Sequence, residues 1–136
     1  MSVSHAKDRV LVACGDFEGV GVDVEPVIEP AEAQALLPSI INDEELSAAG
    51  WAIPYWVRKE AVLKAIGKGL SVPMRNLTVS PPYEPPSLRH FEGHDCVVER
   101  VSMTQLQYDV DYYAVLAVIG TPLTQVIEQD ISKAMC

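Results

Sequence analysis

The sequence lacks long apolar runs, an apolar N-terminal segment and a recognisable cysteine pattern. No stretch reaches the ~18 apolar residues that a membrane-spanning helix needs, so we predict no membrane association. The first ten residues, MSVSHAKDRV, do not form the apolar centre of a secretory signal. The three cysteines, Cys14, Cys96 and Cys136, are odd in number and lack metal-ligand spacing. We therefore predict a cytoplasmic protein, in a reducing compartment.

Positive charge is also scarce. Ten Lys and Arg residues stand against 19 Asp and Glu residues, and the resulting net charge of −9 argues against nucleic acid as a partner. Half of the basic residues nevertheless fall in one short stretch: Arg58, Lys59, Lys64, Lys68 and Arg75. Such a local basic patch suits a compact anion such as a phosphate, and it equally suits a solvated helix face.

Apolar residues, by contrast, are abundant. They make up 49% of the 136 residues, which is enough for one domain with its own core, and we assign residues 1–136 to it. Hydrophobic spacing and turn residues predict strands at 9–15, 20–26, 76–80, 95–102 and 111–120, helices at 31–40, 42–50 and 54–70, and an exposed proline-rich loop at 81–86. The first two strands are predicted to form a hairpin. This order predicts an α+β domain with a single antiparallel sheet and the long helix packed on it.

The predicted strand 20–26 has two carboxylates on one face. Successive side chains in a strand point to opposite sides, so its valines share one face, and Gly21, Asp23 and Glu25 share the other. Two like charges so close raise each other's pKa unless a positive group lies between them. The pattern therefore indicates either a salt-bridged sheet face or a cation site.

The predicted helix 54–70 has a carboxylate and a lysine on one face. Glu60 lies four residues after Trp56, which anchors the helix, and four before Lys64, so it neighbours both on one face of the helix. By itself a Glu–Lys pair at this spacing is an ordinary surface pair that stabilises a helix by ~0.2–0.5 kcal/mol. A different interpretation follows if the strand and the helix pack together, because Glu60 then joins the two strand carboxylates.

Three carboxylates without a His or Cys partner suit a hard cation, and Mg²⁺ is the cation that we expect. Mg²⁺ usually binds substrate phosphates as well, and Lys64 would face these phosphates as a point charge. Acidic metal ligands beside a basic phosphate contact form a phosphoryl-transfer site. A Mg²⁺-dependent phosphotransferase and a Mg²⁺-dependent pyrophosphatase would both use these residues.

Two segments together resemble the paired signature motifs of a known family. The segments GVDVE (residues 21–25) and WVRKEAVLKAIGKGL (residues 56–70) resemble those of the 4′-phosphopantetheinyl transferases. The flanking segments SVSHA (residues 2–6) and KGLSVP (residues 68–73) are similar to the second half of the type that serves nonribosomal peptide and polyketide synthases. The resemblance implies a phosphopantetheinyl-transferase-like half-domain, or a domain integrated in such a synthase.

The resemblance also implies a reaction, namely transfer of the phosphopantetheine arm of coenzyme A to a serine of an acyl or peptidyl carrier protein. It implies that Asp23, Glu25 and Glu60 hold Mg²⁺ against the pyrophosphate of coenzyme A. Glu60, Lys64 and Glu45 are the implied catalytic residues. Lys64 would neutralise or protonate the leaving phosphate, and Glu45 would orient a water or a neighbouring group.

Coenzyme A contacts are implied for Ser4, His5, Lys64 and Lys68, with Ser4 and His5 at the phosphates of the nucleotide end. The chain matches only one half of the two-part enzymes, so we predict a homo-oligomer, a trimer or a dimer, with coenzyme A between chains. Two alternatives stay open. The chain is a domain of a longer polypeptide, or it is a non-enzymatic half-domain that binds coenzyme A or a carrier protein.

Overall fold

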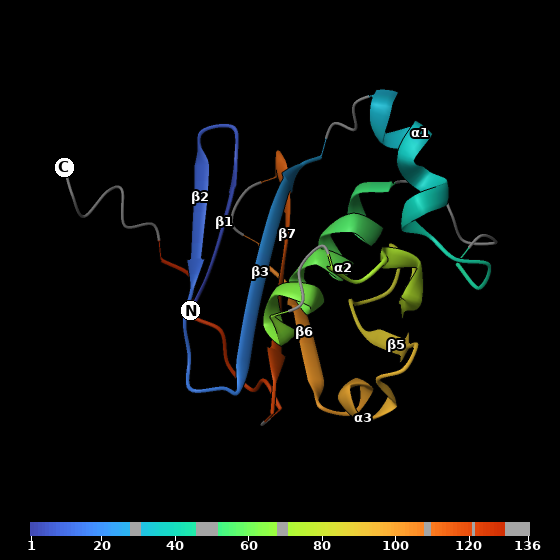
Figure 1. Cartoon of the computed structure of the whole chain (residues 1–136). Helices are drawn as coiled ribbons and strands as arrows, with labels where there is room; N and C mark the ends of the chain where they lie inside the picture. Colours follow the sequence, from blue (N-terminus) through green and yellow to red (C-terminus); the bar gives the residue numbers. More distant parts are fainter. Residues whose placement is uncertain (28–30, 46–51, 68–70, 108–109, 121, 130–136) are drawn as a thin grey trace.

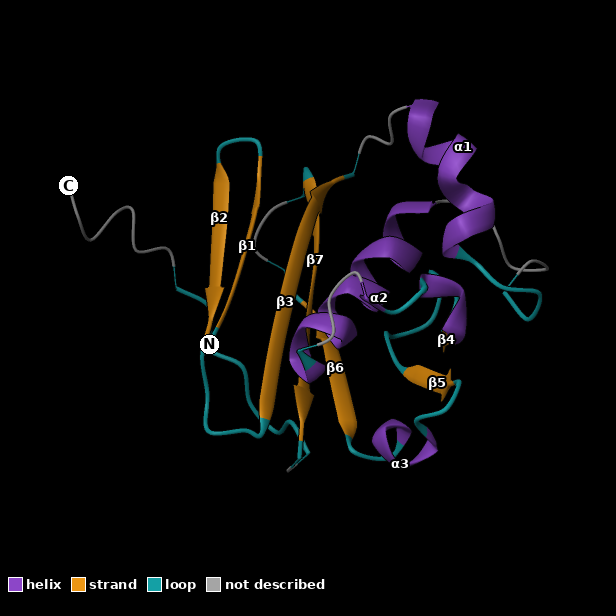
Figure 2. Ribbon diagram, viewed as in Figure 1, coloured by secondary structure: helices purple, strands orange, loops and turns teal. Residues whose placement is uncertain are grey.

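The computed structural model describes residues 1–27, 31–45, 52–67, 71–107, 110–120 and 122–129. In chain order the elements are β1 (Ser2–Ala6), β2 (Arg9–Ala13), β3 (Gly19–Pro26), α1 (Ala31–Ile40), α2 (Ala52–Ile66), the 3-10 turn η3 (Met74–Asn76), β4 (Leu77–Val79), β5 (Leu88–Phe91), α3 (Asp95–Val98), β6 (Val101–Gln105) and β7 (Tyr112–Ile119). The predicted α+β class, with antiparallel strands and a long packed helix, is confirmed (Figure 2).

The described strands form three separate antiparallel sheets and not the single predicted one: β1–β2, β3–β7–β6 and β4–β5. The predicted hairpin between residues 9–15 and 20–26 is wrong, because β2 pairs with β1 and β3 pairs with β7. The real hairpin turns at Lys7, which adopts a left-handed backbone conformation with φ of 52°.

Two further sequence predictions need correction or fall partly outside the description. The predicted strand 95–102 begins instead with the helical turn α3, and β6 starts only at Val101. Strand β5 was not predicted. Of the predicted helix 42–50, residues 46–50 lie outside the described part of the chain, and residues 43–45 form a turn.

Helix α2 lies on one face of the β3–β7–β6 sheet, and the β1–β2 hairpin lies on the other side of β3 (Figure 1). The helix takes up Pro54 in its first turn, where a missing N–H is tolerated, and it ends before Gly67, whose φ is 74°. Residues 68–70, the end of the predicted helix, lie outside the described residues.

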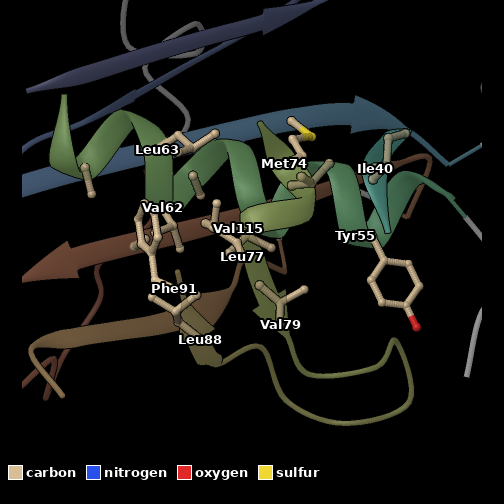
Figure 3. Packing of buried hydrophobic residues seen from close by; sticks show 14 of the residues in the cluster. Ile40, Tyr55, Val62, Leu63, Met74, Leu77, Val79, Leu88, Phe91 and Val115 are labelled. Carbon is tan, nitrogen blue, oxygen red and sulfur yellow. The ribbon is translucent and has the colours of Figure 1, made fainter. Parts of the chain in front are cut away.

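The main core lies where α2 packs between the β3–β7–β6 sheet and the β4–β5 pair (Figure 3). Val62 and Leu63 of α2 are fully buried, as are Val115 of β7 and Leu77 and Phe91 of the small sheet. Burying a side chain of this kind stabilises the fold by about 1.5–3 kcal/mol. The opposite face of the central sheet packs its remaining valines and leucines against the hairpin.

No helix among the described residues combines the length and the hydropathy that crossing a membrane would require.

Candidate active site

Strand β3 and helix α2 approach each other unusually closely because small residues meet on both sides. A Cβ added at Gly21 would collide with the carbonyl oxygen of Ala61 and would lie 2.6 Å from the backbone nitrogen of Ala65. One added at Gly19 would collide with the carbonyl oxygen of Ala65. Gly21 therefore leaves no room for a cation or a substrate, since the space beside its Cα is filled by the helix backbone.

This approach brings the strand carboxylates and the helix charges together. Lys64 Nζ donates to Asp23 Oδ1 at 3.1 Å and to the carbonyl oxygen of Val22 at 3.1 Å. It also reaches the carbonyl oxygen of Val3 on β1 at 3.4 Å. In this structure, the positive group beside the strand carboxylates is therefore Lys64. The surface-pair interpretation of Glu60 and Lys64 does not hold, because Lys64 pairs across to Asp23.

Two carboxylate oxygens at this contact have unused acceptor capacity. Asp23 Oδ2 and Glu60 Oε1 are buried, and within the described part of the chain neither accepts a hydrogen bond. A buried anionic oxygen without a donor is costly, so such atoms call for a further positive partner. These two oxygens, from a strand and a helix, fit the oxygen-only ligand set of a hard cation.

The electrostatics of the cluster agree with this interpretation. Burial raises the pKa of Asp23 to about 7, although Lys64 acts against the shift, and the charges of Glu25 and Glu60 add to it. Burial also raises the pKa values of Glu25 and Glu60, with Lys64 again opposing. Each carboxyl group therefore holds its proton more tightly than in water, and a cation would have to displace that proton.

The third predicted ligand, Glu25, lies on the same face of β3 as Asp23. It is half-buried, next along the strand face from Asp23, and its pKa is affected by the charges of Lys64, Glu60 and His5. His5 itself is exposed on the outer face of β1. Within the described ranges, no group of three or more Asp, Glu, His or Cys side chains already forms a metal-binding arrangement.

Ser4 lies in the cluster, but not as a surface residue. It is 5% exposed, its hydroxyl accepts a hydrogen bond from the Val24 N–H at 3.2 Å, and it donates to Asp23 Oδ1 at 3.2 Å. The resemblance implied a contact with nucleotide phosphates, whereas in the structure the hydroxyl is engaged on both sides by β3. The predicted coenzyme A contact Lys68 lies outside the described residues.

Glu45, predicted as catalytic, lies in a different buried network. Its Oε1 accepts from Lys59 Nζ at 2.6 Å and from the Asn42 N–H at 3.0 Å, and its Oε2 accepts from the Val79 N–H at 2.9 Å. Lys59 also donates to the carbonyl oxygen of Ile40 at 2.6 Å. Burial lowers the pKa of Lys59, while Glu45 opposes that shift. The carboxylate therefore ties α2 to β4 and to the turn after α1.

The basic patch of the sequence is not one surface. Arg58 is fully buried and donates to the carbonyl oxygens of Ser80, Pro81 and Glu84, at 2.6–2.8 Å, and to the hydroxyl of Tyr113 at 2.9 Å. These hydrogen bonds attach helix α2 to the proline-rich loop 81–86. Arg58 and Lys59 thus fit neither the phosphate-binding nor the solvated-face interpretation, and Lys64 alone of the described basic residues lies among the strand carboxylates.

Comparison with known proteins identifies the family. The sequence model of the 4′-phosphopantetheinyl transferase superfamily matches residues 19–115, which is more than half of the chain. The chain therefore belongs to the 4′-phosphopantetheinyl transferase superfamily. No curated protein matches the sequence with significance.

Solved structures agree at the level of the fold. The chain is similar to the holo-ACP-synthase from Plasmodium yoelii, with a TM-score of 0.55 and 18% identity over 77% of this chain and 96% of that one. It is also similar to the Thermotoga maritima holo-[acyl-carrier-protein] synthase, with a TM-score of 0.60 and 20% identity over 86% of this chain and 72% of that one. The half-domain subtype suggested by the sequence is not confirmed by these likenesses.

Proposed function

We propose that this chain transfers the 4′-phosphopantetheine arm of coenzyme A to a serine of an acyl or peptidyl carrier protein, in a Mg²⁺-dependent reaction. The observation that supports it most strongly is the contact between β3 and α2. There, in a member of this superfamily, Lys64 pairs with Asp23 beside two buried carboxylate oxygens that accept no hydrogen bond from the described residues.

Asp23 and Glu60 would hold the cation through these two oxygens, and Glu25 would complete the set. Mg²⁺ usually takes only one or two carboxylates and keeps waters and substrate phosphates as its other ligands, so a complete protein cage is not required. When bound, Mg²⁺ would offset the charge that develops on the pyrophosphate oxygens. The remaining chemistry belongs to the side chains.

The reaction exchanges one phosphorus–oxygen bond for another. The serine oxygen of the carrier forms a bond to the phosphorus of the phosphopantetheine arm, and the bond to the nucleotide phosphate breaks. Glu60 is the base that we assign to the serine proton, in addition to its part in holding the cation. Lys64 neutralises or protonates the leaving phosphate.

The other assigned residues act from further away. Glu45 acts indirectly in this proposal, since both of its oxygens already bind protein groups and fix α2 against β4. His5 contacts the phosphates from the exposed face of β1. The SVSHA segment supports the subtype that serves nonribosomal peptide and polyketide synthases. In this proposal a second copy of the chain, in a homo-oligomer, supplies the other wall of the coenzyme A site.

The test is a transfer assay read by mass spectrometry. The chain is incubated with coenzyme A, Mg²⁺ and several apo carrier proteins, and we expect one carrier to gain the mass of the arm, with no gain in EDTA. The Glu60→Gln variant is the control for carry-over of a contaminating transferase. A folded chain that binds coenzyme A and modifies no carrier would favour the non-enzymatic half-domain, and phosphate release without any carrier would favour another phosphotransferase.

A further inference from the structure

Strand β1 meets the outer edge of β3 through side chains and not through a backbone ladder. In the sheet order β3–β7–β6, one edge of β3 faces away from its partner strand. The Val22 and Val24 N–H groups on that edge donate to Ser2 Oγ at 3.1 Å and to Ser4 Oγ at 3.2 Å. The two serines are thus equivalent in their backbone contact, and both are buried.

They differ in what else the hydroxyl does. The hydroxyl of Ser4 donates a hydrogen bond to Asp23 Oδ1 at 3.2 Å. Among the described residues, Ser2 makes no corresponding hydrogen bond to a carboxylate. Asp23 Oδ1 therefore receives two donors, the hydroxyl from β1 and Lys64 from α2. Its other oxygen, Oδ2, is buried and receives no donor from the part of the chain that the structure describes.

This asymmetry fixes the rotation of the carboxylate. Two donors that approach one oxygen from different elements hold it in place, so the free oxygen has a single defined direction. Metal ligands are generally oriented by such neighbouring hydrogen bonds, and these partners matter for metal affinity. Lys64 has a second task in the proposed reaction, at the leaving phosphate, whereas the serine hydroxyl serves only β3.

We propose that Ser4 is a positioning residue that orients Asp23 Oδ2 toward the cation site. The inference rests on the proposed function and replaces the nucleotide-phosphate contact implied for Ser4 by the sequence resemblance. It extends the site to the N-terminal strand, which lies outside the residues matched by the family model.

The test compares Ser4→Ala with the matched control Ser2→Ala. Both variants lose the acceptor of one β3 backbone N–H, and Ser4→Ala also loses the hydrogen bond to Asp23, so we expect urea unfolding to show a loss of stability for both and a somewhat larger one for Ser4→Ala. Mn²⁺ serves as the probe because it favours the same oxygen ligands as Mg²⁺, and its binding to the chain without coenzyme A is followed by electron paramagnetic resonance. We expect Ser4→Ala to weaken Mn²⁺ binding by about tenfold, while Ser2→Ala stays within about twofold of the parent.

Further measurements separate the competing roles. In EDTA, the parent chain and Ser4→Ala should bind coenzyme A with equal affinity. If Ser4→Ala instead binds coenzyme A more weakly and Mn²⁺ as tightly as the parent, Ser4 contacts the nucleotide phosphates and the inference is wrong. Equal weakening of Mn²⁺ binding by both alanine variants would reduce Ser4 to a structural residue. In an Asp23→Asn background, Ser4→Ala should have no additional effect on Mn²⁺.

If Ser4→Ala does not fold, the isosteric pair Ser4→Thr and Ser4→Val replaces it. Threonine keeps the hydroxyl and adds one methyl group, and valine has nearly the same shape with a second methyl group in place of the hydroxyl. The steric cost of the two variants is therefore similar, and only the threonine variant should retain Mn²⁺ affinity. A parent that transfers the arm while Ser4→Ala binds Mn²⁺ normally would overturn this inference and leave the proposed function standing. A parent that neither binds Mn²⁺ nor transfers the arm would overturn both.

Discussion

Asp23 is the residue on which several features of the molecule converge. Its side chain is 7% exposed, it pairs with Lys64 and Ser4 through one oxygen, and its pKa lies at about 7 because of burial. A carboxyl group with this pKa is half protonated at neutral pH, whereas an exposed aspartate is fully ionised. Any cation that binds here competes with a proton in the physiological range.

Cation affinity should therefore depend on pH between 6 and 8. Only the ionised carboxylate binds the cation, so affinity rises as pH rises through about 7 and levels off above it. From pH 8 to pH 6 the ionised fraction falls about tenfold, and we expect Mg²⁺ affinity to fall by the same factor. Calorimetric titration at pH 6, 7 and 8 measures this, and the Asp23→Asn variant should bind weakly at every pH. Equal affinity of the parent at pH 6 and 8 would contradict the prediction.

Glu60 and Lys64 should separate cation binding from catalysis. Glu60→Gln keeps the shape and removes the charge, so the Mg²⁺ requirement should move to much higher concentration and turnover should fall, with little change in stability. Lys64→Ala should lower turnover by about 10²–10³-fold, by analogy with the loss of other charge-stabilising donors. It should weaken Mg²⁺ binding less than Glu60→Gln does, because Lys64 is itself a cation on Asp23.

Initial rates measured over a series of Mg²⁺ concentrations distinguish the two effects. The control is unfolding in urea, which should show both variants folded. Transfer by both variants at the parent rate would show that the helix plays no catalytic part.

At the scale of elements, the site depends on how closely β3 and α2 pack. Gly19 and Gly21 face Ala61 and Ala65, so the two backbones meet with almost no side chain between them. This contact sets the distance from Asp23 on the strand to Lys64 on the helix. A wider spacing would break the ion pair and separate the two unpartnered oxygens.

The Gly21→Ala variant should therefore lose both stability and cation binding. The added methyl meets backbone atoms of the helix, which cannot rotate away, so we expect a loss of about 3 kcal/mol, at the upper end for overpacking. Gly93→Ala is the control. Its φ is 79° and nothing lies within 4 Å of the added carbon, so it should cost only about 1–2 kcal/mol of backbone strain. Urea unfolding and Mn²⁺ titration of both variants test this, and normal Mn²⁺ binding by Gly21→Ala would contradict it.

The part of the site that the sequence predicts is the part with local periodicity. Alternation along a strand puts Asp23 and Glu25 on one face, and helical spacing puts Glu60 and Lys64 on another, so packing of the two elements is enough to join them. The burial of Asp23 and its pairing with Lys64 agree with that reasoning. Strand β7 and helix α1 were likewise placed by their apolar spacing.

The hairpin could not be predicted in the same way. In β1 the buried positions hold serine and alanine and the exposed ones valine and histidine, which reverses the usual pattern. Its turn is at Lys7 and contains no glycine, whereas the glycines at 15 and 19 indicated a turn elsewhere.

The burial of Arg58 and Lys59 could not be predicted either, because charged residues are rarely fully buried. Arg58 has its partners at residues 80–84 and Lys59 has its partner at Glu45, so no local sequence pattern predicts these contacts.

At the scale of the whole molecule, the outer face of the β1–β2 hairpin is apolar and open. Val3, Val10 and Val12 are 50%, 65% and 56% exposed, and the strand register places Val3 beside Val12 and His5 beside Val10. Burial raises the pKa of Glu25, and the charge of His5 is among the effects that oppose this shift, so His5 lies near the site. A second copy of the chain on this face would therefore adjoin the proposed coenzyme A site.

The last prediction is that the chain forms a symmetric homo-oligomer, a trimer or otherwise a dimer, through this hairpin face. Ligand sites favour concave surfaces between subunits, and a closed assembly would give each cluster its second wall. Sedimentation at tens of micromolar should show the oligomer, and Val12→Lys should shift it toward monomer because an unpaired charge is costly to bury. Val110→Lys is the control, since this valine is 92% exposed and lies outside the hairpin. A parent chain that sediments as a monomer, even with coenzyme A present, would show that the second wall is not supplied by another copy.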